Sequence, residues 1–238
     1  MTVLRQRNNK DRKNMLIVLE GLDGAGKSTQ IRRISQYVAA SGRKVEHLHF
    51  PRYDAPVFGA MIAAYLRGDY GAIDSVHPQI VALLFAEDRR MAADEIRRKL
   101  EDGCCVILDR YVYSNIAFQC AKSAESEAAA LRDWILDVEY NVFGIPRPDL
   151  NLFLDVPISF VDARLHETRE GDDRAYLGGK EDIHEQDIRF QQRVRELYLE
   201  QCSRDGSFHR IECGDSQGRM LSEEDIFARI KTQIDKLI

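Results

Sequence analysis

The sequence predicts an α/β fold in which a five-stranded, parallel sheet is covered by helices on both faces. Three observations support this: five short apolar runs, helix-length segments between them, and a glycine-rich turn directly after the first run. The runs are "MLIVLE" (15–20), "KVEHLHF" (44–50), "CCVILD" (104–109), "LNLFLDV" (150–156) and "SFHRIEC" (207–213). Strands that alternate with helices favour a parallel sheet, because parallel neighbours need a long crossover connection.

Segments of helical length separate these runs, and their apolar residues recur at helical spacing. They cover residues 55–68, 77–103, 131–144 and 222–238. The last segment opens on Ser222, a residue type that caps helix N-termini, and the first two end at glycines. No repeat or linker interrupts the pattern, so we expect a single domain over residues 15–238.

Composition and charge narrow the class of protein. The 238 residues are 44% hydrophobic and 31% charged, which is typical of a soluble globular protein, and the formal net charge is −5. Residues 1–14 hold five basic residues against one Asp, or +4, which leaves −9 for the remaining chain. An acidic body argues against a nucleic-acid-binding protein. The basic extension could contact RNA or a membrane, but we interpret it as a solvated, mobile terminus.

Neither a signal peptide nor a membrane span is expected. The basic extension lacks an apolar core, and no apolar run approaches membrane-spanning length.

Five cysteines without a paired short spacing argue against a disulfide framework or a zinc site, so we expect small core residues in a reducing cytoplasm. His47 and His49 could share a strand face and bind a metal, but we interpret them as ordinary strand residues because further ligands are lacking nearby.

The glycine-rich turn "EGLDGAGKSTQ" (20–30) points to a phosphate site. It matches G-x-x-x-x-G-K-S/T from Gly21 to Ser28, between a predicted strand and a predicted helix. Glycines let backbone N–H groups converge on a phosphate, and the following helix presents the positive end of its dipole. Lys27 can reach the outer phosphates, and the Ser28 hydroxyl can bind Mg²⁺. The turn therefore predicts binding of a nucleoside triphosphate.

Two further segments combine an aromatic ring with a guanidinium group. In "FPRYD", Phe50 can stack on a flat ring and Arg52 can bind a phosphate, although a strand end with a surface arginine explains the segment equally well. In "LLFAEDRR", Phe85 and Arg89 are four residues apart and share a helix face, where they could stack a base and bind its edge. A core phenylalanine beside a surface arginine is the alternative.

Charged residues follow the third and fourth strands. In "VILDRYVYS", Asp109 stands where an acid can hold Mg²⁺ or its water, and Arg110 can face a second anion. An ion pair within the loop is the alternative. The polar segment 162–187 holds Arg164, Arg169 and Arg174 and could be a flap that closes over a transferred phosphoryl group. By itself it also fits a solvated helix with internal ion pairs.

Together these segments predict two anion sites that face each other, one for a triphosphate and one for an acceptor. Phosphoryl transfer needs in-line placement, Mg²⁺ and positive charge more than it needs covalent help from the protein. A phosphate acceptor is already ionised near neutral pH, so no general base is required. That chemistry fits a site in which we find no evident base or nucleophile.

The segments "LIVLEGLDGAGKSTQ", "FPRY", "LLFAEDR", "DRYVYSNIAFQ" and "PRPDLNLFLDV" resemble thymidylate kinases in order and spacing, over roughly residues 15–235. The resemblance implies transfer of phosphoryl from ATP to dTMP, giving dTDP and ADP. It also implies a three-layer P-loop kinase fold with a mobile lid, here about residues 164–185, and a homodimer. We expect neither a nucleic acid nor a membrane partner.

The resemblance also implies residue roles. The ATP site would comprise Gly21, Asp23, Gly24, Ala25, Gly26, Lys27, Ser28 and Thr29 with the lid arginines Arg164, Arg169 and Arg174. The dTMP site would comprise Asp23, Phe50, Arg52, Phe85, Arg89, Arg110, Ser114, Asn115 and Gln119. Asp23 would contact the 3′-OH, Phe85 would stack on thymine, and Arg110 would bind the acceptor phosphate. Catalysis would rest on Lys27, Asp109, Arg110 and Arg174, with Ser28 and Asp109 near Mg²⁺.

Two departures from the family pattern affect these roles. Arg52 comes one residue early relative to F-P-x-R, and Gly24 stands where some members carry an arginine. Members without that arginine place basic residues in the lid, which favours the flap interpretation, with Arg174 as the first choice. His184 and Glu185 close the lid where the family often has an aromatic–acid pair.

Two rival functions remain open. A kinase of another pyrimidine monophosphate or of a deoxynucleoside would share the loop, although a neutral acceptor would need a base and would leave Arg110 unexplained. A nucleotide-driven switch or partner-binding ATPase is the rival from another class. The chain lacks the N-K-x-D motif that reads guanine, which weakens the GTPase version.

Overall fold

A five-stranded parallel sheet forms the centre of the molecule. The computed structural model describes residues 14–166, 177, 182–184 and 187–237. The strands are β1 (Met15–Gly21), β2 (Val45–His49), β3 (Cys105–Asp109), β4 (Leu150–Asp155) and β5 (Phe208–Glu212), in the order β2-β3-β1-β4-β5. All pairs are parallel. Each predicted run forms a strand whose ends lie within one residue of the prediction.

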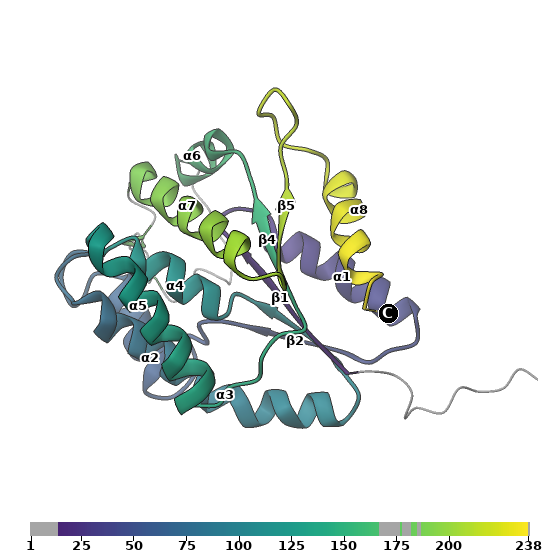
Figure 1. Ribbon diagram of the computed structural model, residues 1–238, viewed down its shortest axis with the longest axis horizontal. Helices are drawn as coiled ribbons and strands as arrows, with labels where there is room; N and C mark the ends of the chain where they lie inside the picture. The colour runs from purple at the N-terminus through teal and green to yellow at the C-terminus, as the bar shows by residue number, and fades with distance from the viewer. Residues whose placement is uncertain (1–13, 167–176, 178–181, 185–186, 238) are drawn as a thin grey trace, which may run out of the picture.

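Helices cover both faces of the sheet and confirm the predicted α/β architecture (Figure 1). They are α1 (Lys27–Ala40), α2 (Phe58–Leu66), α3 (Pro78–Glu101), α4 (Val112–Cys120), α5 (Glu125–Asp137), α6 (Ile158–His166), α7 (Ile188–Arg204) and α8 (Glu223–Ile234). A π-helical turn, η2 (Val138–Val142), extends α5. Helices α1 and α8 pack together on one face, whereas α3, α4, α5 and α7 lie on the other. Ser222 caps α8 as predicted, because its hydroxyl accepts from the N–H of Asp225 at 3.1 Å.

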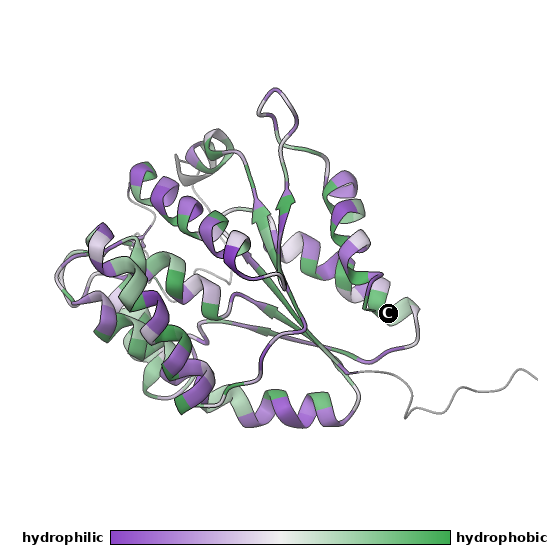
Figure 2. Cartoon of the chain, viewed as in Figure 1, coloured by the Kyte–Doolittle hydropathy of each residue, from purple (hydrophilic) through white to green (hydrophobic). Residues whose placement is uncertain are grey.

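The central strands are buried on both sides. Every residue of β1, β3 and β4 is buried, and Figure 2 shows these strands as a hydrophobic layer between amphipathic helices. Burial on both faces explains why these strands appear in the sequence as continuous apolar runs rather than alternating ones. Four of the five cysteines belong to this core, and all five are free thiols. Within the described ranges, no helix is both long and apolar enough to cross a membrane.

The register of β1 and β3 brings the predicted motifs together. Leu19 lies beside Asp109, and the N–H of Arg110 donates to the Leu19 carbonyl at 2.8 Å. On the other side of β3, the N–H of Phe50 donates to the Asp109 carbonyl at 2.9 Å. The phosphate loop, the "FPRYD" loop and the "DRYVYS" segment therefore leave the same edge of the sheet, where α/β proteins bind ligands.

Helix α4 was not expected from the sequence. All nine of its residues are buried, because it lies between α3, α5 and α7 above β1. A helix buried all round shows no amphipathic period, so periodicity cannot reveal it. This helix supplies Ser114, Asn115 and Gln119, and its burial fixes them on a rigid element.

Candidate active site

The phosphate loop has the backbone that its glycines permit. Gly24 and Gly26 have φ of 75° and 81°, in the left-handed region that side-chain-bearing residues rarely adopt. A Cβ at Gly26 would meet no atom within 4 Å, so the dihedral angle and not crowding calls for glycine there. Helix α1 then begins at Lys27 with no side-chain cap and no acid in its first turn. Its first N–H groups and its dipole are therefore available to an anion.

Lys27 is buried beside the loop that precedes it. Its Nζ donates to the Leu22 carbonyl at 3.2 Å and lies 4.0 Å from Oδ1 of Asp109. Burial lowers the pKa of Lys27, and the nearby Arg110 lowers it further, while Asp109 and Asp23 oppose the shift. A phosphate group bound nearby would bring negative charge and would raise the pKa of Lys27 again.

Asp109 offers a ligand to a cation. It ends β3, is 6% exposed, and its Oδ1 is buried without a hydrogen-bond partner. A buried carboxylate oxygen without a hydrogen bond is costly unless a cation lies close to it, and the Lys27 ammonium group is at the limit of an ion pair, 4.0 Å away. The exposed Ser28 hydroxyl stands at the start of α1, one residue after Lys27. This donor set of hard oxygens fits Mg²⁺, which is usually held by one or two protein ligands together with substrate phosphates.

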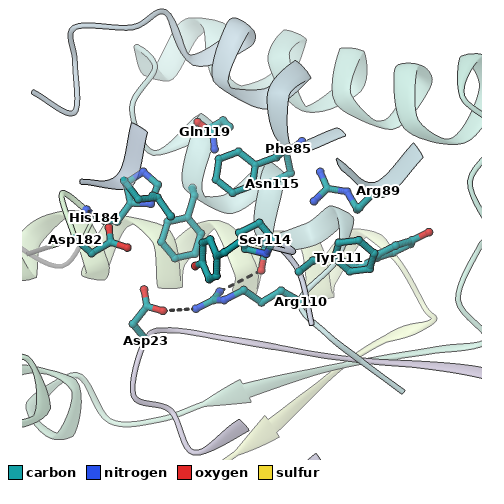
Figure 3. A pocket seen from close by; sticks show the side chains of 15 residues that line it. Asp23, Phe85, Arg89, Arg110, Tyr111, Ser114, Asn115, Gln119, Asp182 and His184 are labelled. Carbon is teal, nitrogen blue, oxygen red and sulfur yellow. Dashed lines mark hydrogen bonds and ion pairs between the residues drawn. The ribbon is translucent and has the colours of Figure 1, made fainter. Parts of the chain in front are cut away.

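A cleft opens beside this loop (Figure 3). Its walls are Asp23, Phe50, Pro51, Tyr53, Leu66, Phe85, Arg89, Arg110, Tyr111, Ser114, Asn115, Phe118, Gln119, Asp182 and His184. Its lining combines aromatic walls with a few polar groups, which is the usual character of a small-molecule site. Eight of the nine residues predicted for an acceptor therefore share one cleft.

Arg110 forms the polar end of the cleft nearest the phosphate loop. Its φ of 65° is unusual for a residue with a side chain, and such strain is commonly found at functional sites. The guanidinium Nη2 donates to Oδ1 of Asp23 at 2.5 Å, and Nη1 donates to Oγ of Ser114 at 3.2 Å (Figure 3). It also lies 5.2 Å from the Phe118 ring centre. Burial opposes the charge, but Asp23 and other acids outweigh it and raise the pKa of Arg110.

The opposite end of the cleft is aromatic and carries amide groups. Phe85 lies there beside Asn115 and Gln119 (Figure 3). Asn115 Oδ1 and Gln119 Oε1 are buried without hydrogen-bond partners. Arg89 is 2% exposed, and its guanidinium forms a two-bonded ion pair with Glu139. This end can enclose a flat ring and hydrogen-bond its edge.

The decisive comparison is with a family model. A family model with the description "Thymidylate kinase" matches residues 19–223 of this chain. The chain belongs to the thymidylate kinase family. It is an ATP-dependent nucleoside monophosphate kinase, and its reaction transfers the γ-phosphoryl group of ATP to dTMP, which gives dTDP and ADP. The function predicted from the sequence is thus confirmed.

Individual relatives agree with this assignment. Thymidylate kinase of Mycobacterium tuberculosis is 36% identical over 186 residues, which are 78% of this chain and 85% of that protein. Human thymidylate kinase is 37% identical over 149 residues, or 62% of this chain and 64% of that one. A solved thymidylate kinase of Candida albicans, described as having broad substrate specificity, aligns with a TM-score of 0.67 at 26% identity. That alignment covers 95% of this chain and 91% of the solved one.

Not every expected residue of this thymidylate kinase lies in the cleft. Arg52 does not line it, because its backbone N–H and Nε both donate to the Asp88 carboxylate at 2.9 Å. Arg164 belongs to α6, whereas Arg169 and Arg174 lie outside the described residues. Most of the expected lid and residues 1–13 also lie outside the described residues.

The end of the expected lid contributes one residue to the cleft. His184 is buried between the rings of Phe118, Tyr65 and Phe190, at centroid distances of 5.2, 5.8 and 5.6 Å. Burial lowers the pKa of His184 well below its usual value, so the ring is neutral near pH 7. Glu185, its expected acidic partner, lies outside the described residues.

Sequence reasoning missed two buried acids that hold cleft residues in place. Glu20, at the end of β1, accepts from the N–H groups of Tyr111 and Ser114 at 3.0 and 3.2 Å and from the Ser114 hydroxyl. Burial raises the pKa of Glu20, and these hydrogen bonds partly offset the rise. Glu139 is 0% exposed beneath Arg89. The position of Glu20, a charged residue near the end of a buried strand, could have indicated its role from the sequence.

Proposed function

We propose that dTMP occupies the cleft with its phosphate on Arg110 and its thymine ring between Phe85 and the amides of Asn115 and Gln119. The observation that supports this orientation is the polarity of the cleft: its only described guanidinium group near Lys27 is that of Arg110, and its aromatic end lies away from the loop. Asp23, between the two phosphate sites, would meet the sugar 3′-OH. The two phosphates would then face each other.

The reaction needs positioning and charge more than proton transfer. An oxygen of the dTMP phosphate attacks the γ-phosphorus, the bond to the β,γ-bridging oxygen breaks, and ADP leaves with that electron pair. The loop N–H groups and Lys27 would hold the ATP phosphates, and Arg110 would align the attacking phosphate. Because that phosphate is already ionised, the buried Glu20 and the neutral His184 are not needed as bases.

Mg²⁺ is the expected metal. Ser28 and Asp109 would hold it, and the ion would neutralise charge on the transferring phosphoryl group when bound. Lid arginines would add positive charge around the transferred phosphoryl group. The loop carries Gly24 in place of an arginine, which favours this role for the lid, and Arg174 is our first choice among Arg164, Arg169 and Arg174.

A homodimer is also part of the proposal. Large apolar side chains are exposed on α2, α3 and the neighbouring segments: Val57, Met61, Ile80, Leu83, Met91 and Val142. Exposed large apolar side chains on neighbouring helices are a feature of surfaces that bind another subunit. The five free thiols fit a protein of the reducing cytoplasm, which is where we place it.

Calorimetric titration of the protein with dTMP and, separately, with thymidine tests the proposed orientation of dTMP in the cleft. We expect dTMP to bind at least about tenfold more tightly, because a charge-assisted hydrogen bond to Arg110 is worth about 1.5–3 kcal/mol. Thymidine has the same base and sugar, so it serves as the matched control. Equal affinities would show that the phosphate does not reach Arg110 and would remove the basis of the proposal.

A further inference from the structure

One buried carboxylate holds both polar groups at the base end of the cleft. Glu139 lies in the π-helical turn η2 and is 0% exposed. Its Oε2 accepts from Nε of Arg89 at 2.5 Å, and its Oε1 accepts from Nη2 of Arg89 at 2.7 Å and from Nδ2 of Asn115 at 2.9 Å. Single π-helical turns inside helices occur often at functional sites.

These contacts fix the orientation of the Asn115 amide. Nδ2 also donates to the Ala82 carbonyl at 3.0 Å, so it faces two acceptors at once. The flipped amide would set its oxygen against both, and both hydrogen bonds would be lost. Asn115 Oδ1 is therefore the atom left over, and it is buried in the cleft wall without a partner.

Arg89 is fixed in the same way. Nε and Nη2 are held by Glu139, and among the described residues Nη1 has no hydrogen-bond partner. The cleft thus offers a donor on Arg89 and an acceptor on Asn115. A thymine or uracil edge presents the complement, an O4 acceptor beside an N3–H donor. Cytosine presents the reverse, an N4 amino donor beside an unprotonated N3.

We propose that Glu139 is a positioning residue that sets base specificity, by holding Arg89 as a donor and Asn115 as an acceptor toward a thymine-type edge. The proposal rests on the proposed function, because it places the base at this end of the cleft. A buried site with a fixed donor and acceptor rejects the reversed edge, since both groups would be left unpaired. The neutral methyl group of thymine plays no part in this selection, so dUMP and dTMP are treated alike.

The test replaces Glu139→Gln and compares kcat/KM for dTMP, dUMP and dCMP. The amide of Gln cannot accept at both positions, so either Arg89 or Asn115 loses its anchor. We expect dTMP and dUMP to fall together by about 10–100-fold, mainly through KM, while dCMP does not fall with them. The dTMP-to-dCMP ratio then drops at least about tenfold. Glu127→Gln, an exposed position on α5, is the matched control and should leave the ratio unchanged.

A uniform loss on all three substrates would overturn the proposal, because it would show a merely structural role. If the variant does not fold, the unmodified protein still decides: dTMP methylated at N3 should bind at least about tenfold more weakly than dTMP. Equal binding would contradict the acceptor role of Asn115 and the proposal with it. Failure of the unmodified protein to phosphorylate dTMP would instead contradict the proposed function itself, so the two failures are distinguishable.

Discussion

Replacing Arg110 by alanine lowers kcat/KM for dTMP by on the order of 10²–10³-fold and leaves the affinity for ATP nearly unchanged. The guanidinium is buried and held by Asp23 and Ser114 in a strained backbone conformation with φ 65°. No other described side chain of the cleft brings a cation to its end near Lys27. Without it, the acceptor phosphate that we propose there would have neither a counter-charge nor a defined orientation beside the loop.

Steady-state kinetics with dTMP, combined with ATP titration, measures both parts of this prediction. Arg110→Lys should recover only part of the activity, because an ammonium group cannot bind Asp23 and a phosphate with a planar fork. Arg90→Ala is the control, since this arginine lies on α3 in an exposed pair with Glu87. Turnover of dTMP by the alanine variant at the unmodified rate would refute the acceptor role of Arg110.

Replacing Asp109 by asparagine lowers kcat by on the order of 10²-fold and raises the Mg²⁺ concentration needed for half-maximal rate. Asparagine keeps the shape of the side chain but removes the charge that faces Lys27 at 4.0 Å. It also replaces one oxygen of the carboxylate that we propose as a metal ligand by an amide nitrogen, which cannot bind a cation. The substitution therefore weakens both the charge balance at Lys27 and the binding of the metal, and both changes slow phosphoryl transfer.

Mg²⁺ titration at fixed ATP gives the measurement for this variant. Asp102→Asn changes an exposed acid at the end of α3 and should behave as the unmodified protein does. An Asp109→Asn enzyme with unaltered Mg²⁺ dependence would show that the metal is held elsewhere. In that case the Asp109 carboxylate would have a structural role and would not bind the metal.

The strands and the chemistry at their ends could be predicted from the sequence because each depends on local signals. A strand buried on both faces is a continuous apolar run, and the segments "EGLDGAGKSTQ" and "DRYVYS" each follow one directly. Parallel topology then requires the carboxyl ends of neighbouring strands to meet, and the pairing of Leu19 with Asp109 confirms this.

Partnerships between distant residues could not be predicted. Nothing in the sequence pairs Asp88 with Arg52, yet the Asp88 carboxylate accepts two hydrogen bonds of 2.9 Å from Arg52 and holds it out of the cleft. Glu139 is fifty positions from Arg89, and a π-helical turn changes the helical phase on which a face assignment depends. Arg89 was expected to bind a base edge, and its anchor on Glu139 defines how it could do so. That role remains a proposal.

ADP release with Mg-ATP and a panel of acceptors decides whether two phosphate sites face each other in this protein. The panel holds dTMP, dUMP, UMP, dCMP, CMP, dGMP and AMP, with thymidine as the acceptor that lacks a phosphate. We expect rapid release with dTMP, slow release with dCMP and CMP, and none with thymidine, because two facing anion sites need a phosphate on each substrate. Comparable rates with thymidine and dTMP would show that Arg110 does not form an acceptor phosphate site.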